Sequence, residues 1–112
     1  MQLIIHTETD VNKLQGKFVL QVDNVQPDMT LMDCRWDFAK AKRIRMVVGF
    51  GFVDLFGMQT RYDSYEKFKN VFNHYLFDHM IAEGKTSGGR FHRLLTNAEL
   101  SYLFEKIKEE NY

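Results

Sequence analysis

The alternation of hydrophobic and polar residues predicts β-strands over most of the first half of the chain. In residues 17–22 every second side chain, from Phe18 to Val22, is apolar and shares one face. Residues 43–58 show the longest alternation, which predicts one continuous strand that bends because it contains glycine. Shorter apolar runs predict three further strands, at residues 2–6, 29–34 and 90–95.

Two glycines interrupt one face of the long predicted strand. Gly49 and Gly51 lie two residues apart and therefore on the same side of the strand. The lack of side chains there permits a bulge, a barrel corner or the close approach of a flat group. The opposite face is apolar throughout and consists of Ile44, Met46, Val48, Phe50 and Phe52.

In the second half of the chain, hydrophobic residues recur every three or four positions, which predicts helices. A capping box at Asp63 and Glu66 marks the start of a helix over residues 64–83. A second capping box, at Thr96 and Glu99, begins the last helix. The stripes expected to face the core are Tyr65, Phe68, Phe72, Tyr75, Leu76 and Met80 in the first helix, and Leu100, Leu103, Phe104 and Ile107 in the second.

Two short segments have weaker patterns. Thr9 and Asp10 are suited to cap a single helical turn that ends at Gly16. Residues 35–41 have near-helical spacing but are too few to distinguish a loop from a helical turn. Both segments are therefore expected to connect the strands.

The order of these elements predicts an α+β fold. Strands that come first and helices that follow favour an antiparallel sheet over a doubly wound parallel one. Four or five strands in 112 residues favour a small, partly closed, β-barrel-like sheet covered by the two helices of the C-terminal half. Because a chain of this length builds one core, residues 1–112 are expected to form a single domain.

The composition is typical of a folded protein from a reducing compartment. With 45% hydrophobic and 27% charged residues, the chain has enough apolar side chains to bury a core. The single cysteine, Cys34, excludes an internal disulfide. No apolar run reaches the roughly 18 residues of a membrane span, and the N-terminus lacks a basic segment of the signal-peptide type. We therefore expect a cytoplasmic protein with no membrane partner.

The charges of the chain are balanced in number but not in position. Fifteen basic and 15 acidic residues cancel, so the overall charge does not attract nucleic acid. Residues 35–45 nevertheless carry a local net charge of +4 and residues 85–93 carry +3, which leaves −7 for the remainder. If the fold joins the two basic segments, the protein presents one positive face to phosphates. The alternative is that both are ordinary solvated segments.

Residues 48–55 resemble the ribonucleoprotein octapeptide of RNA-recognition motif domains, with six of the eight positions in agreement when the free position is counted. In that family the aromatic residues lie on a central strand and stack on bases, so the resemblance implies a stacking role for Phe50 and Phe52. Val48 stands where that family has a basic residue, and Leu55 where it has an aromatic one. The first predicted strand also lacks the aromatic residue of the partner motif.

Two interpretations of this aromatic strand remain open. Phe50 and Phe52 either stack on bases or pack in the core with the other apolar residues of their face. In the second case the glycine face is accessible, and Arg43 and Arg45 flank it as a shallow basic groove. Both interpretations place a binding surface on this strand.

Residues 90–93 form a second candidate contact segment. Arg90, Phe91, His92 and Arg93 alternate basic and ring side chains, a pattern that suits phosphates and bases. The alternative is a surface strand with its phenylalanine buried. Trp36 is likewise either a stacking residue or an anchor in the core.

The sequence lacks the motifs of common enzymes and metal sites. His74 and His79 are five residues apart, so they do not share a helix face, and no HExxH or CxxC spacing is found. No spacing singles out a pair of carboxylates for acid–base catalysis, and a lone cysteine is commonly inert. We therefore expect a non-enzymatic protein without a metal or cofactor.

These patterns predict a small regulatory protein that binds nucleic acid, RNA rather than DNA, through a basic and aromatic surface. The alternative is a protein-binding accessory or inhibitor protein, or a homodimer, that uses apolar side chains exposed on the aromatic-rich strand or on the helix of residues 65–80. The candidate nucleic-acid-binding residues are Arg35, Trp36, Lys40, Lys42, Arg43, Arg45, Phe50, Phe52, Arg90, Phe91, His92 and Arg93.

Overall fold

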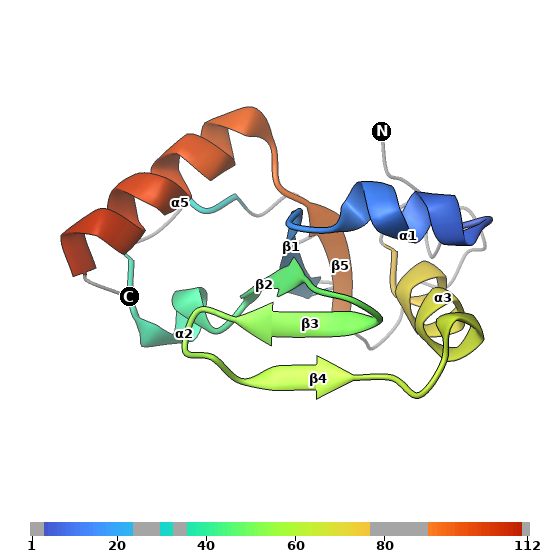
Figure 1. Ribbon diagram of the computed structural model, residues 1–112. Helices are drawn as coiled ribbons and strands as arrows, with labels where there is room; N and C mark the ends of the chain where they lie inside the picture. Colours follow the sequence, from blue (N-terminus) through green and yellow to red (C-terminus); the bar gives the residue numbers. More distant parts are fainter. Residues whose placement is uncertain (1–3, 24–29, 33–35, 77–89, 111–112) are drawn as a thin grey trace.

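One antiparallel sheet of five strands organises the chain in a computed structural model that describes residues 4–23, 30–32, 36–76 and 90–110 (Figure 1). The order of strands is β4-β3-β2-β1-β5, so β4 and β5 are the two edges and the sheet does not close. The α+β class is confirmed, whereas the partly closed barrel shape is not what the strands form. The strands are β1 (Phe18–Asp23), β2 (Ile44–Val47), β3 (Gly51–Asp54), β4 (Gln59–Arg61) and β5 (Arg90–Leu94).

Helices cover both faces of this sheet. Helix α1 (Glu8–Leu14) and helix α3 (Tyr65–His74) lie together at one side, and α5 (Asn97–Glu110) lies apart from them (Figure 1). A single-turn helix, α2 (Phe38–Ala41), precedes β2. The expected cover by two helices from the C-terminal half is therefore only partly correct, because α3 and α5 pack on opposite faces and α1 adds a third helix.

Two hydrophobic clusters fill the space between the helices and the sheet. In β1, Val19 belongs to one cluster and its neighbour Leu20 to the other, because successive side chains of a strand point to opposite faces. The α1/α3 cluster contains Ile5, Val11, Leu14, Val19, Val47, Phe52, Phe68, Phe72 and Leu76. The α5 cluster contains Leu20, Val22, Leu31, Ile44, Phe91, Leu95 and Leu103.

The prediction of one continuous strand over residues 43–58 is wrong, because a turn divides this segment into β2 and β3. Val48 N donates to Gly51 O at 3.0 Å, and Gly49 has a φ of 59°, a left-handed conformation that glycine adopts without strain. The two halves then pair as a hairpin, with Val47 opposite Phe52. Alternation did not reveal the turn, since apolar residues continue through it.

The helix predicted over residues 64–83 begins at Tyr65, one residue from its predicted start, but leaves helical geometry after His74. The predicted capping box at Asp63 and Glu66 is wrong, because the N-cap is Ser64, whose Oγ accepts from Lys67 N at 3.2 Å. It ends where Leu76 forms a parallel bridge with His92, and Tyr75 O accepts from His92 N at 2.8 Å. Tertiary pairing with β5 therefore replaces the helical hydrogen bonds. Residues 77–83 lie outside the described part of the chain.

Two other predicted strands differ from the structure. Residues 4–6 are not a strand, because the side chain of Asn73 on α3 pairs with the backbone N and O of Ile5, both at 2.8 Å. Residues 30–32 form a turn, and the rest of the predicted 29–34 strand lies outside the described residues. The predicted helical turn is a two-turn helix, α1, that begins after Thr7.

Three predicted elements are confirmed. Residues 17–22 become β1 with a shift of one residue, and residues 90–95 become β5. The last helix begins at its predicted capping box, in which Glu99 N donates to Thr96 Oγ1 at 3.2 Å and Thr96 N donates to Glu99 Oε1 at 3.0 Å. All three rest on local signals, period two in the strands and end-capping in the helix.

Candidate functional site

The turn after β3 and the short helix α2 present large apolar side chains to solvent. Phe38 is 63% exposed, Phe56 40% and Met58 67%. The rings of Phe38 and Phe56 are 5.0 Å apart, and Lys42 Nζ lies 5.5 Å and 5.6 Å from their centres. These four residues form what we call the aromatic patch. It combines apolar area with a cation held over rings.

A carboxylate builds the turn that carries half of this patch. Asp54 Oδ1 accepts hydrogen bonds from the backbone N of Phe56 and of Met58, both at 2.9 Å. Gly57 has a φ of 86°, which lets the chain reverse into β4. The side chain of Asp54 therefore holds the β3–β4 turn, and the backbone that carries Phe56 and Met58 has a fixed conformation.

Edge strand β4 continues from the aromatic patch and is exposed at all three residues. Asp54 N donates to Met58 O at 3.0 Å, and Tyr62 N donates to Phe50 O at 3.0 Å. Because antiparallel strands point alternate residues toward each other, Gln59 and Arg61 direct their backbone groups away from β3. Within the described residues, these groups have no hydrogen-bond partner.

A glycine allows β4 to lie so close to β3. A Cβ placed on Gly51 would lie 2.0 Å from Thr60 O and 3.0 Å from the Cα of Arg61. Such contacts are with backbone, so any side chain at Gly51 would push β4 outward. The glycine face was expected to admit something flat, and the approaching group is the backbone of β4.

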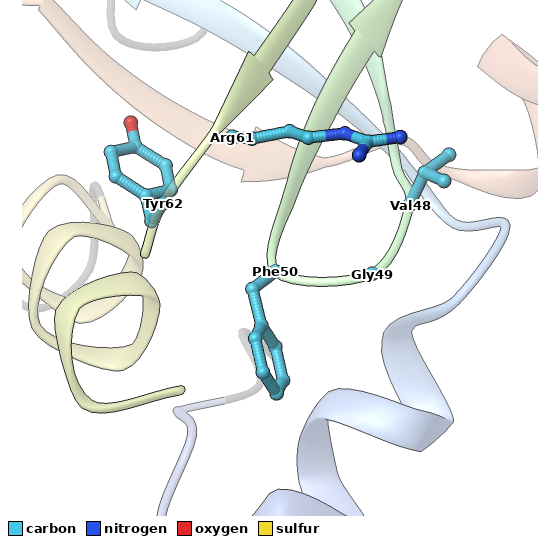
Figure 2. A pocket seen from close by; sticks show the side chains of 5 residues that line it. All are labelled: Val48, Gly49, Phe50, Arg61 and Tyr62. Carbon is cyan, nitrogen blue, oxygen red and sulfur yellow. The ribbon is translucent and has the colours of Figure 1, made fainter. Parts of the chain in front are cut away.

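A pocket of about 320 Å³ lies at the far end of β4, beside the β2–β3 turn. Figure 2 shows the Arg61 side chain reaching from β4 toward Val48, while the Phe50 ring projects from the turn in another direction. Phe50 is 39% exposed and its ring lies 6.3 Å from that of Tyr65. The residues that line the pocket are Val48, Gly49, Phe50, Arg61 and Tyr62.

The side-chain amide of Gln15, just after α1, holds this turn in place. Gly49 N donates to Gln15 Oε1 at 2.6 Å, and Gln15 Nε2 donates to Gly49 O at 3.0 Å. The two bonds satisfy both backbone groups of a glycine at the tip of a turn. The pocket therefore has a fixed wall on its β2–β3 side.

The core interpretation applies to two of the predicted stacking residues. Phe52 is 3% exposed and lies between α3 and the sheet, with its ring nearly parallel to that of Phe72 at 6.3 Å. Phe91 is 2% exposed in the α5 cluster. As folded, neither ring is accessible to a base, and of the two phenylalanines in the predicted platform only Phe50 reaches solvent.

Arg45 and His92 contact the ring of Phe52 from the same side of the sheet. Arg45 Cζ lies 4.3 Å from the centre of that ring, and burial lowers the pKa of its guanidinium although Tyr62 and Asp54 partly restore it. His92 is 3% exposed, and its Nε2 lies 2.9 Å from Phe72 O. Burial lowers the pKa of His92 to about 4, against the bond to Phe72 and with the help of the Arg45 charge.

On the other side of the sheet, Arg93 forms a forked ion pair with Glu99. Arg93 Nη1 and Nη2 donate to Glu99 Oε1 and Oε2 at 2.8 Å and 2.9 Å. Glu99 is fully buried and also accepts from Leu31 N at 3.1 Å. Burial favours the protonated acid, yet the bonds from Arg93, Thr96 and Leu31 together hold the pKa of Glu99 below its usual range.

The remaining candidates have mixed positions. Lys40 is 5% exposed and donates to Leu31 O at 2.6 Å, and Trp36 packs edge-on against Tyr102 at 6.0 Å. Arg43 is half-buried, whereas Lys42 is exposed in the aromatic patch. Arg35 and the side chain of Arg90 lie outside the described residues.

The two basic segments come together in the sheet without forming one positive face. Arg45 pairs with Val19 and Arg93 pairs with Leu20, and these neighbours in β1 point to opposite faces. The arginines are therefore directed to opposite sides of the sheet, where Phe52 and Glu99 engage them.

Sequence reasoning missed Phe38, Phe56, Met58, Arg61 and Tyr62. A signal for the hairpin was available, because Asp54 is followed three residues later by Gly57 between two runs that alternate. Prediction of a turn at this position would also have predicted that Phe56 and Met58 lie exposed at its tip. The partnership with Phe38 is tertiary and has no local signal.

Comparison with known proteins finds no family model, no curated protein and no solved structure that matches the chain. Among the described residues, no three His, Cys, Asp or Glu side chains gather as a metal site. No helix in the same residues is long and apolar enough to cross a bilayer. The aromatic patch and β4 together form an exposed surface of rings, a cation and open backbone groups.

Proposed function

We propose that this protein is a non-enzymatic accessory protein of the cytoplasm that binds a polypeptide partner through the aromatic patch and the adjoining edge strand β4. The observation that supports the proposal is the contact between Phe38 and Phe56, two exposed rings 5.0 Å apart that Lys42 covers only in part. Exposed phenylalanine and methionine side chains that lie close together are typical of the centre of protein interfaces.

The alternative, RNA binding, has weaker support. Two of the arginines expected to contact phosphates are half-buried and held by other side chains, Arg45 over Phe52 and Arg93 with Glu99. Salt-dependent binding to phosphates needs several accessible cations on one surface. In the aromatic patch and the pocket at Arg61, the cations beside exposed rings are Lys42 and Arg61, and these two lie at opposite ends of the β3–β4 hairpin.

The proposal is tested by selecting short random peptides, displayed on phage, on the immobilised full-length protein. We expect enriched peptides whose synthetic versions bind with a Kd on the order of micromolar in fluorescence anisotropy, and whose binding weakens by at least about tenfold in the Phe38→Ala, Phe56→Ala double variant. The matched control is Phe104→Ala, which removes a ring that is 54% exposed on α5. That variant should bind like the wild type.

Three results would overturn the proposal. The first is that no peptide is enriched. The second is that the patch variant binds the enriched peptides as well as the wild type does. The third is that a mixed-sequence RNA oligonucleotide binds at low salt, with loss of binding on Arg61→Ala, which would favour RNA. Analytical ultracentrifugation identifies a second copy of the chain as the occupant if the wild type is a dimer and the Phe38→Ala, Phe56→Ala double variant is a monomer.

A further inference from the structure

The outward edge of β4 has backbone groups without partners and a cation near each of its two ends. We propose that the partner is an extended, acidic polypeptide segment that adds a sixth strand to the sheet at β4, with one carboxylate at Arg61. This inference rests on the polypeptide-binding function proposed above. It further specifies the conformation of the partner and the sign of its charge.

The backbone of β4 is prepared for another strand. Gln59 and Arg61 occupy the positions of the antiparallel ladder that point away from β3, so each offers one N–H and one C=O. An added strand would satisfy all four groups, which is how extended peptides bind at sheet edges. Gly51 keeps β4 close to β3, because a Cβ at this position would meet Thr60 O at 2.0 Å. The edge is therefore anchored to the sheet.

The positive charges near this edge favour acidic residues in the added peptide segment. Lys42 lies over the rings of Phe38 and Phe56 at the β3–β4 turn, and Arg61 lies at the other end of β4. Among the described residues neither cation has an ion-pair partner. The nearest carboxylates along the chain are engaged elsewhere, Asp37 in capping α2, Asp54 in the turn and Asp63 with Lys67 at 3.8 Å. Acidic side chains on the added strand would complement both cations.

The pocket at Arg61 provides the site for one of these carboxylates. Its volume of about 320 Å³ accommodates one side chain, and the Arg61 side chain extends along it toward Val48 (Figure 2). A planar guanidinium accepts a carboxylate through two parallel hydrogen bonds. Met58 and Arg61 are three residues apart, which is about 10 Å along a strand. The segment should therefore carry an apolar residue three or four positions from its acidic residue.

The test of strand addition uses the backbone and not the side chains. Gln59→Pro removes one of the two outward N–H groups of β4 and leaves the hydrogen bonds to β3 in place, because proline is tolerated where the N–H faces solvent. Gln59→Val is the matched control that keeps the N–H. With the peptides from the display selection as probes, we expect Gln59→Pro to weaken binding at least about tenfold and Gln59→Val to have no effect. Peptides methylated on alternate backbone nitrogens repeat the test on the unaltered protein.

The test of charge uses reversal and rescue. Arg61→Glu should weaken binding of the acidic peptides at least about tenfold, and replacement of their glutamates by lysine should restore it. Lys108→Glu, a reversal at an exposed residue of α5, is the control. Enriched peptides that are neutral or basic would overturn the charge of the proposed partner.

The outcomes separate this inference from the proposed function. Strand addition would be overturned if the selected peptides bind Gln59→Pro as well as the wild type and if their methylated versions also bind. The polypeptide-binding function would stand in that case, provided that binding still depends on Phe38 and Phe56. A selection that enriches no peptide overturns both. Circular dichroism of Gln59→Pro identifies a folding defect, and the methylated peptides then decide the question.

Discussion

Two regions of the molecule, an inner region and the β3–β4 hairpin, use charged and aromatic side chains in opposite ways. The inner region consists of strands β1, β2 and β5 and the helices that cover both of their faces, and in it Arg45, His92 and Arg93 are held by rings, a carbonyl or a carboxylate. In the hairpin, Phe56 and Met58 face solvent and Arg61 has no ion-pair partner among the described residues. Residues of the same chemical type therefore stabilise one region and remain available for binding in the other.

The comparison predicts that the largest loss of stability comes from the buried carboxylate of the inner region. Glu99→Ala leaves Arg93 without its forked partner and removes the bonds to Thr96 N and Leu31 N. Breaking a buried pair by removing one partner costs about 3 to 5 kcal/mol of the free energy of unfolding. Urea denaturation measures this loss. Glu109→Gln, which breaks an exposed pair with Lys106, is the control and should leave the midpoint unchanged.

The inner region should also make the protein unstable in acid. The pKa of His92 is about 4 in the folded protein and about 6.5 when unfolded, so the unfolded state binds the proton more readily. The contribution of His92 to the free energy of unfolding should therefore be fully present above pH 6.5. It should be lost as the pH drops toward 4, by roughly 3 kcal/mol in total. The lowered pKa of Glu99 adds a further loss, which begins as the pH falls to about 4.5 and grows below it. Urea titrations between pH 7 and pH 4 measure this slope, and His92→Gln should flatten it; an unchanged slope would contradict the assignment.

The pairing of β4 with β3 should weaken when Gly51 is replaced by a residue with a side chain. Gly51→Ala forces β4 away from β3, since the new Cβ would overlap with Thr60 O. We expect a loss of about 1 to 3 kcal/mol in the free energy of unfolding, typical of overpacking. Amide hydrogen exchange should show loss of protection at Thr60. Gly49→Asn is the control, because the left-handed φ of 59° suits asparagine and nothing lies within 4 Å of its Cβ.

The smallest effect on stability is expected in the aromatic patch. Phe38→Ala removes a side chain that is 63% exposed, so the free energy of unfolding measured by urea denaturation should change by no more than about 0.5 kcal/mol. Binding of the selected peptides should nevertheless fall severalfold. A large loss of stability would place Phe38 in the core and remove the contrast between the two regions.

The predictions made from the sequence were most accurate where a local signal sufficed. Period two identified residues 17–22 and 90–95 as strands, and the Thr96–Glu99 capping box marked the start of the last helix. The 43–58 strand was wrong because apolar residues continue through the turn at Gly49, so alternation carries no sign of the reversal. The helix after Ser64 ended early because Leu76 pairs with β5, a contact that spacing within the helix does not record.

The candidate site was less predictable than the fold. Arg93 and Glu99 are six residues apart, yet they were assigned separate roles, as a phosphate contact and as a helix cap. One carboxylate performs both the capping and the pairing because β5 and α5 meet at that point. RNA binding stays a prediction. Of the candidate nucleic-acid-binding residues in the described part of the chain, Lys42 and Phe50 are exposed.

The sequence by itself determined the class of the fold, the neutrality of the chain and the positions of β1, β5 and the start of α5, since each follows from local periodicity, capping or composition. Only the tertiary structure decided which cations are buried and which aromatic side chains are exposed. The reason is that strand register sets the face of each side chain, and register depends on a turn at residues 48–50. The same turn places Arg61 at the end of an open sheet edge and Phe52 in the core.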